Sequence, residues 1–139
     1  MKLPHWIRYT EKVKQGEAGL FIIYLNPAKR GDEGLLAHEY EHVKQWYLCL
    51  AIGLLCAAGV YFLFGNLLVS LVIAAVSVSL KGILYSYVTS FRKWAEVKAF
   101  KRQIAVTEGD HRDFFAAALA DNYRLNITFS EALRALYNG

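Results

Sequence analysis

Residues 45–80 read QWYLCLAIGLLCAAGVYFLFGNLLVSLVIAAVSVSL, and none of these 36 residues carries a formal charge. Lys81 interrupts the run, and ten further uncharged residues follow before Arg92. A helix crosses the hydrocarbon core of a bilayer with about 20 residues, so the segment is too long for one crossing and fits two. Gly65-Asn66 marks the expected turn between a helix over 46–64 and a second over 67–88. The sequence therefore predicts a membrane hairpin over 46–88.

The ends of this hairpin carry aromatic residues that favour the membrane interface: Trp46, Tyr47, Tyr85 and Tyr87. Lys81 is expected either to snorkel toward the surface or to face protein. The alternative is a soluble protein that buries the hairpin in a helical core or a dimer interface. A chain of 139 residues could hardly cover both helices on every side, which favours the membrane.

The charges lie on both sides of the apolar stretch. With 55% hydrophobic and 20% charged residues, the composition excludes a disordered chain. The 16 Lys and Arg outnumber 12 Asp and Glu, but they follow no nucleic-acid-binding motif, so no nucleic-acid partner is expected. Both flanks are rich in cations and the Gly65-Asn66 tip has none. We expect a two-pass protein of the inner (cytoplasmic) membrane with both termini in the cytoplasm.

The polar flanks predict a single domain over residues 1–139 of the α+β class, mainly α. Strands over 7–13 and 20–25 are expected to form a β-hairpin through residues 15–19. A helix begins near Leu35, and after the membrane segment we expect helices over 92–106, from Asp110 to about 120, and over 132–137. Thr128-Phe129-Ser130-Glu131 matches a capping box before the last of these.

Residues 36–45, LAHEYEHVKQ, contain the pattern His-Glu-x-x-His inside a predicted helix. His38 and His42 differ by about 40° around the helix, so both imidazoles can reach one metal ion. Glu39 lies beside them, where its carboxylate can accept a proton from water. By angle alone Glu41 can also approach the metal, although a surface pair with Lys44 is simpler. The alternative is an amphipathic helix with two solvent-facing histidines.

A catalytic zinc site normally has three protein ligands, so a third must come from elsewhere in the chain. Our choice is Glu96, on the helix expected over 92–106; its alternative role is a surface pair with Arg92 at i,i+4. Two membrane crossings would return Glu96 to the side of the histidines, whereas one would separate them by the bilayer. Competing ligands are Glu108, Asp110, His111, Asp113 and Asp121.

These motifs resemble those of gluzincin metallopeptidases, in particular a reduced form of the membrane heat-shock and prenyl-protein (CAAX) endopeptidases or the small minigluzincins. The resemblance covers about residues 20–103. It implies a zincin-like fold in which His38, His42 and Glu96 bind Zn²⁺ and Glu39 is the general base and acid. It also implies that the strand over 20–25 pairs with an extended peptide substrate.

The sequence departs from this family in two places. Larger gluzincins often carry an Asp one turn after the Glu ligand, where it orients a histidine, but position 100 is Phe. That role would pass to a backbone carbonyl or to a distant acid such as Asp121. The family also uses a later side chain to stabilise the oxyanion, and here the candidates are Tyr123 and His111.

Two other functions fit the same residues. In one, zinc clamps the two flanks of the hairpin of a membrane adaptor or regulator that hydrolyses nothing. In the other, a metal-free hairpin oligomerises in lipid through small residues, namely Gly53, Ala57, Ala58 and Gly59. The expected partners are thus a peptide or protein substrate, membrane lipid and, in the second case, further copies of the chain.

Overall fold

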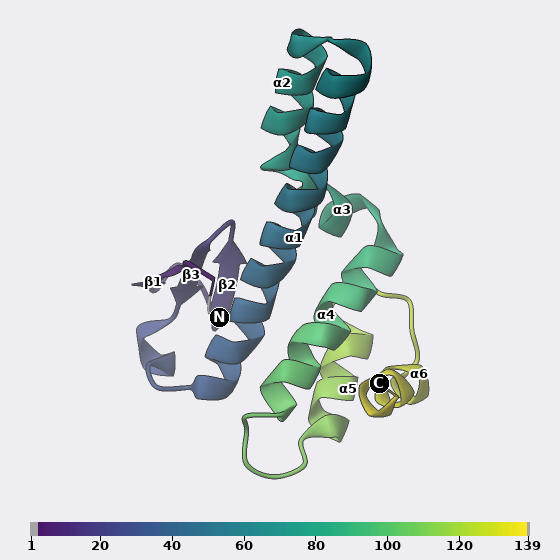
Figure 1. Cartoon of the computed structure of the whole chain (residues 1–139). Helices are drawn as coiled ribbons and strands as arrows, with labels where there is room; N and C mark the ends of the chain where they lie inside the picture. The colour runs from purple at the N-terminus through teal and green to yellow at the C-terminus, as the bar shows by residue number, and fades with distance from the viewer. Residues whose placement is uncertain (1–2, 139) are drawn as a thin grey trace.

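The computed structural model describes residues 3–138, which form a mainly helical structure with a small three-stranded sheet (Figure 1). This confirms the α+β, mainly α class. The elements are β1 (Trp6–Tyr9), β2 (Gly16–Gly19), β3 (Ile22–Leu25), a 3-10 turn (Pro27–Lys29), α1 (Glu33–Phe64), α2 (Leu67–Ser77), α3 (Leu80–Tyr87), α4 (Thr89–Ile104), α5 (Arg112–Asn122) and α6 (Phe129–Tyr137).

Helix α1 is the spine of the molecule. It begins after Asp32, whose side chain accepts a hydrogen bond from the backbone N–H of Leu35, and ends at Gly65 with a left-handed φ of 63°. The histidine helix and the first apolar helix are therefore one helix of 32 residues. Nothing between His42 and Trp46 stops a helix, so the backbone continues straight from the polar part into the apolar part.

Helices α1 and α2 form the expected hairpin around Gly65-Asn66 (Figure 1). Asn66 caps α2 by accepting from the backbone N–H of Val69. The two helices approach most closely where Gly53 faces Ser77, since a Cβ atom on Gly53 would overlap the Ser77 side chain. Most other large side chains of this hairpin are exposed, so it presents an apolar surface.

The second arm differs from the single helix expected over 67–88. It breaks after Ser77 and resumes as α3, with a bend of 62°. Trp46 explains part of the break, because its indole N–H donates to the carbonyl oxygen of Val78 at 2.8 Å. Within residues 3–138, only α1 is by itself long and apolar enough to cross a membrane; α2 and α3 add a second candidate only if the bent pair is one span.

The sheet has the order β1-β3-β2, which differs from the expected hairpin. Residues 16–19, expected to be the connection, form strand β2 antiparallel to β3, while β1 pairs with β3 in parallel. The two expected strands therefore do pair, over Trp6–Tyr9 and Ile22–Leu25, but in parallel, so the expected β-hairpin between them is wrong. Gly16 explains the difference, because the absence of a side chain there lets β2 lie close against Glu39 of α1.

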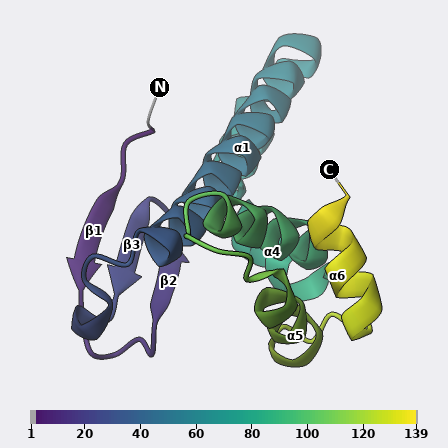
Figure 2. The same ribbon diagram turned by 90° about the horizontal axis from the view of Figure 1, so that it is seen from below.

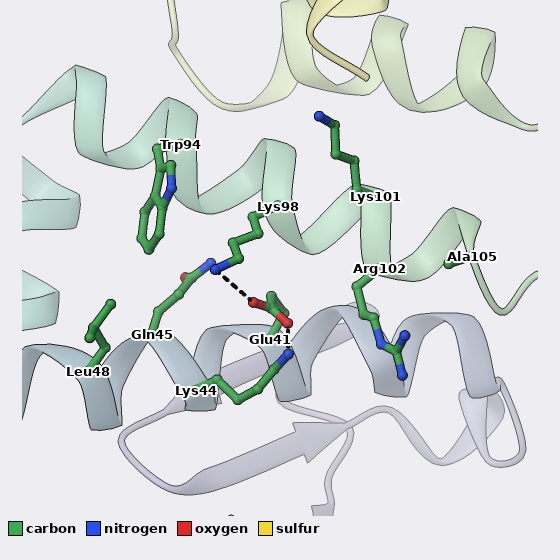
Figure 3. Close-up of a pocket in the computed structure, with 9 residues that line it drawn as sticks. All are labelled: Glu41, Lys44, Gln45, Leu48, Trp94, Lys98, Lys101, Arg102 and Ala105. Atoms are coloured by element: carbon green, nitrogen blue, oxygen red, sulfur yellow. Dashed lines mark ion pairs between the residues drawn. The ribbon is translucent and has the colours of Figure 1, made fainter. Parts of the chain in front are cut away.

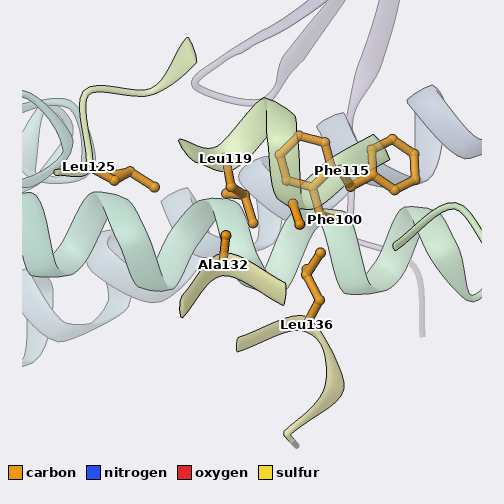
Figure 4. Packing of buried hydrophobic residues seen from close by; sticks show 7 residues of the cluster. Phe100, Phe115, Leu119, Leu125, Ala132 and Leu136 are labelled. Atoms are coloured by element: carbon orange, nitrogen blue, oxygen red, sulfur yellow. The ribbon is translucent and has the colours of Figure 1, made fainter. Parts of the chain in front are cut away.

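Helices α4, α5 and α6 pack on the other side of α1 from the sheet (Figure 2). They share a core in which Phe100 of α4 packs against Phe115 of α5 (Figure 4). The expected capping box is confirmed at Thr128 and Glu131, at the start of α6. The buried residues of this core are Phe100, Phe115, Ala116, Leu119, Leu125, Ala132 and Leu136. The first turns of α1 are thus enclosed between the sheet and α4.

Candidate metal centre

Helices α1 and α4 lie side by side and bring the three expected ligands together. His38 and His42 project from α1 and Glu96 from α4, and all three side chains are buried. Glu96 is only 1% exposed, so the alternative in which it is a surface charge paired with Arg92 is wrong. Arg92 instead donates to the carbonyl oxygens of Tyr85 and Ser86.

The two oxygens of Glu96 each face one imidazole. Glu96 Oε2 lies 3.5 Å from His38 Nε2, and Glu96 Oε1 lies 3.4 Å from His42 Nε2. Two imidazole nitrogens and a carboxylate oxygen are ligands that Zn²⁺ takes in proteins. The three ligand atoms lie within 4.8 Å of one another, and the group could hold a metal ion.

A buried oxygen supports the same interpretation. Glu96 Oε2 is shielded from water and has no hydrogen-bond partner among the described residues. Burial by itself would raise the pKa of this carboxyl, but the two imidazoles beside it and the hydrogen bond from Tyr85 outweigh burial and lower the pKa well below its usual range. Glu96 is thus a carboxylate with a free oxygen directed at an imidazole, which fits a metal ligand.

Gln45 orients one of the histidines. Its side-chain oxygen lies 2.9 Å from His42 Nδ1, and its amide nitrogen donates to the carbonyl oxygen of Ala95 at 2.9 Å. This contact leaves His42 Nε2 facing Glu96. Gln45 therefore takes the role that we expected from a backbone carbonyl or from Asp121, and the exposed Asp121 has no part in it.

His38 lacks such a partner. Its Nδ1 is buried without a hydrogen bond to any described residue, and the ring of Phe100 packs against it at a centroid distance of 4.5 Å. Phe100 belongs to the core shared by α4, α5 and α6. Packing, and no hydrogen-bond acceptor, meets the ring of His38 on this side.

Glu39 lies beside the ligands on the same helix. Its carboxylate rests against the backbone of Gly16 in β2, where a Cβ atom would lie 2.9 Å from Glu39 Oε1. Burial raises the pKa of the Glu39 carboxyl from its ordinary 4.5 to about 7; the charge of Glu96 adds to this rise and His38 partly offsets it. Such a carboxyl can both accept and release a proton near neutral pH.

Glu41 differs from Glu39 because it is directed away from the ligands. It forms ion pairs with Lys44 and with Lys98, as expected for Lys44, but it is buried rather than on the surface. Its pairing with two lysines leaves Glu39 as the carboxylate beside the histidines.

Besides Gln45, two residues of the site were not expected there. Tyr85 of α3, expected at a membrane interface, donates a short hydrogen bond to Glu96 Oε1. Lys81, one turn before it, lines the same cavity with its Nζ 5.3 Å from the centre of the Tyr85 ring. Of the two roles expected for Lys81, the structure shows the one that faces protein. The sequence held a signal for this position, because Lys81 is the single charged residue between Lys44 and Arg92.

Tyr123 and His111 have different positions. Tyr123, from the segment after α5, lines the cavity at the ligands, and burial raises the pKa of its phenol. His111 is exposed, and its Nε2 lies 2.8 Å from the carbonyl oxygen of Glu108 in its own loop. Within residues 3–138, the competing acids and His111 form no ligand group with the two histidines of α1.

The ligands open into a cavity of about 310 Å³ that adjoins a larger cleft of about 820 Å³. Strand β2 forms one wall of both, and it is an edge strand, since the sheet order places β3 in the centre. The strand beside the cleft is therefore β2 and not the strand expected over 20–25. An extended chain in the cleft would meet the unpaired edge of β2.

Comparison with protein-family models, curated proteins and solved structures gives no match for this chain.

Proposed function

We propose that the protein is a membrane-anchored zinc metallopeptidase of the gluzincin type. The observation that carries this proposal is the buried group of two imidazoles and one carboxylate, whose ligand atoms lie within 4.8 Å of one another, with a second carboxylate beside it. Two nitrogens and one oxygen suit Zn²⁺, and three protein ligands leave a position for water or substrate. A structural zinc site would instead use four protein ligands.

Each residue of the site has a role in this proposal. His38, His42 and Glu96 would hold Zn²⁺, which when bound polarises a carbonyl oxygen and increases the acidity of water. Glu39 accepts a proton from the attacking water and delivers it to the nitrogen of the leaving amine as the peptide bond breaks. Tyr123 is the better placed of the two expected oxyanion stabilisers, because His111 lies outside the cavity.

The substrate is a peptide or protein segment in extended form. Backbone groups on the free edge of β2 can pair with it, and this edge runs past Glu39 at Gly16. The cavity beside the ligands then receives the side chain next to the bond that is cleaved. The side chains of Lys81 and Tyr85 form its wall on the α3 side.

In this proposal the apolar hairpin anchors the site at a membrane. Residues 46–64 of α1 reach about 28 Å, close to the hydrocarbon thickness of a bilayer. The 11 residues of α2 reach only about 16 Å, so the return crossing includes α3 and is bent. In this proposal the hairpin lies in the inner membrane, and both termini and the site face the cytoplasm.

Replacing Glu39 by Gln tests the mechanism. We expect Glu39→Gln to retain metal near one equivalent and to lose cleavage of a quenched fluorescent peptide library by a factor of about 1,000 or more, because no carboxylate remains to move the proton. Glu33→Gln, an exposed change on the same helix, should match the parent in both measurements. Full activity of Glu39→Gln would contradict the mechanism.

One observation favours a second candidate, a zinc-binding membrane adaptor without hydrolysis. His38 Nδ1 has no acceptor, so one of the two imidazole ligands is oriented by packing alone. A wild-type protein that holds zinc but cleaves no member of a broad peptide library would support this candidate. Cleavage that stops with a chelator and returns with zinc would exclude it.

A further inference from the structure

A second groove, of about 390 Å³, runs along α1 and α4 and shares no lining residue with the cavity at the metal ligands (Figure 3). Four basic side chains and a single carboxylate line it, so its charge is positive. The lining residues are Glu41, Lys44, Gln45, Leu48, Trp94, Lys98, Lys101, Arg102 and Ala105. Of its lining residues, only Gln45, which contacts His42, has a part in the proposed peptidase site.

Glu41 organises the cations of the groove. This carboxylate is only 3% exposed, and it pairs with Lys44 on one side and with Lys98 at 3.7 Å on the other. The side chain of Lys98 remains half-exposed, and Arg102 reaches from α4 toward α1 (Figure 3). Lys101 is turned away and donates to the carbonyl oxygen of Asn138. Three cations therefore face the groove around one buried anion.

The groove also changes in polarity along its length. Leu48 and Trp94 line one end, and both are partly exposed. Helix α1 runs from Glu41 through Leu48 into the apolar hairpin, whereas α4 runs from Trp94 to Arg102 away from it. The apolar end is thus the end nearest the hairpin, and the cations lie one to two turns farther away. This order matches a ligand with a negative head and an apolar tail.

We propose that this groove binds an anionic phospholipid. The phosphate lies among Lys44, Lys98 and Arg102, and the acyl chains pass Leu48 and Trp94 toward the hairpin. Basic side chains beside a membrane attract anionic lipid, with each charge changing affinity about fivefold. The indole of Trp94 suits the boundary between headgroup and chain. This site does not depend on the proposed peptidase activity.

The test uses full-length protein in a neutral detergent, titrated with phosphatidylglycerol or phosphatidylcholine, with bound lipid counted by native mass spectrometry. We expect phosphatidylglycerol to bind at least tenfold more tightly than phosphatidylcholine. The double variant Lys98→Gln/Arg102→Gln should lose about tenfold or more of this preference. The control Arg8→Gln/Arg134→Gln removes two cations outside the groove and should bind like the parent.

A change in the opposite direction separates binding from misfolding. Glu41→Gln removes the anion from the groove and should bind phosphatidylglycerol several-fold more tightly, which a damaged protein would not do. Equal binding of the two lipids, or no effect of Lys98→Gln/Arg102→Gln, would overturn the proposal. Full displacement of the lipid by millimolar inorganic phosphate would also overturn it, because the site would then recognise free phosphate.

Discussion

Gly16 sets the distance between strand β2 and the carboxylate of Glu39. A Cβ atom at this position would lie 2.9 Å from Glu39 Oε1 and 3.0 Å from Glu39 Cγ, which is closer than such atoms lie in proteins. The carboxylate is therefore held between the bare backbone of the strand and the imidazoles of its own helix. Its position depends on the absence of a single methyl group.

Gly16→Ala should therefore displace Glu39 without removing any ligand. We expect metal content to stay near that of the parent and kcat for a cleaved peptide to fall by about 10- to 100-fold, because small displacements of a catalytic group are costly. The control is Gly19→Ala in the same strand, where the nearest atom, on the Tyr24 ring, lies 3.5 Å away. Equal kcat for both variants would show that Glu39 is not held by this contact.

Single residues of the site differ in how far the sequence predicts them. His38, Glu39 and His42 follow from spacing within one helix, and Glu96 was chosen as an acid on a later helix whose apolar positions predict packing against neighbours. Gln45 could not be found in this way, since its role needs the carbonyl oxygen of Ala95 on another helix. Tyr85 was not expected in the site, because an aromatic ring at the end of an apolar segment is typical of a membrane interface.

At the scale of elements, the crossing of α1 and α2 depends on Gly53. Because a methyl group there would overlap Ser77, Gly53→Ala should force the two helices apart. We expect a loss of about 1–3 kcal/mol in the free energy of unfolding, and a melting temperature several degrees lower by circular dichroism in detergent.

Gly59→Ala on the same helix is the control for this prediction, since a Cβ atom there meets nothing within 4 Å. Its melting temperature should be unchanged or slightly higher, as alanine favours a helix over glycine. A lower melting temperature for Gly59→Ala than for Gly53→Ala would contradict the proposed contact. The same crossing uses Gly53 and Ala57 within the chain, so these two residues are buried against a helix of their own molecule.

Chemical labelling at the tip of the hairpin tests whether the hairpin crosses a bilayer. Leu67 lies beside the tip and is exposed, so Leu67→Cys in a background of Cys49→Ala and Cys56→Ala provides a single reactive thiol. If the hairpin crosses the inner membrane, a membrane-impermeant maleimide should label this thiol in intact spheroplasts. Ser130→Cys on α6 should react only after the membrane is opened. Protection of Leu67→Cys from both sides would show that the hairpin turns within the bilayer.

The elements that the sequence did not predict are those whose ends depend on distant contacts. The second arm has an apolar pattern that fits one helix over 67–88, but the indole of Trp46 binds the backbone where the arm bends. Strand β2 contains Gly16-Glu17-Ala18-Gly19, a sequence with little preference for strands, and it pairs because it lies between β3 and α1. The capping box at Thr128 is local, and it was found.

At the scale of the whole molecule, the candidate metal ligands join α1 to α4, two helices that α2 and α3 separate in the sequence. Ion binding should therefore stabilise the contact between α1 and α4. With free zinc at 100 times its Kd, the native state gains about 2.7 kcal/mol, so addition of a chelator should lower the melting temperature by several degrees.

His42→Ala should abolish this dependence on the chelator, whereas His111→Ala, which changes a histidine of an exposed loop, should keep it. A chelator effect that persists in His42→Ala would place the ion elsewhere.

The sequence predicted the mainly helical class and the meeting of the two flanks, because composition and the length of the apolar stretch act over the whole chain. It did not predict the parallel pairing of β1 with β3, which no local pattern records.

The turn at Gly65 divides the ligand set unequally. Among the described residues, the part of the chain before it supplies the imidazoles of His38 and His42 and the neighbouring carboxylate of Glu39, and the part after it supplies Glu96 with its partner Tyr85. Neither part by itself holds the three donors of this group. If the chain were cut at that turn, all three candidate ligands could meet one metal ion only after the two pieces had reassembled. The fraction of protein that holds a metal ion would then measure how completely the two pieces associate.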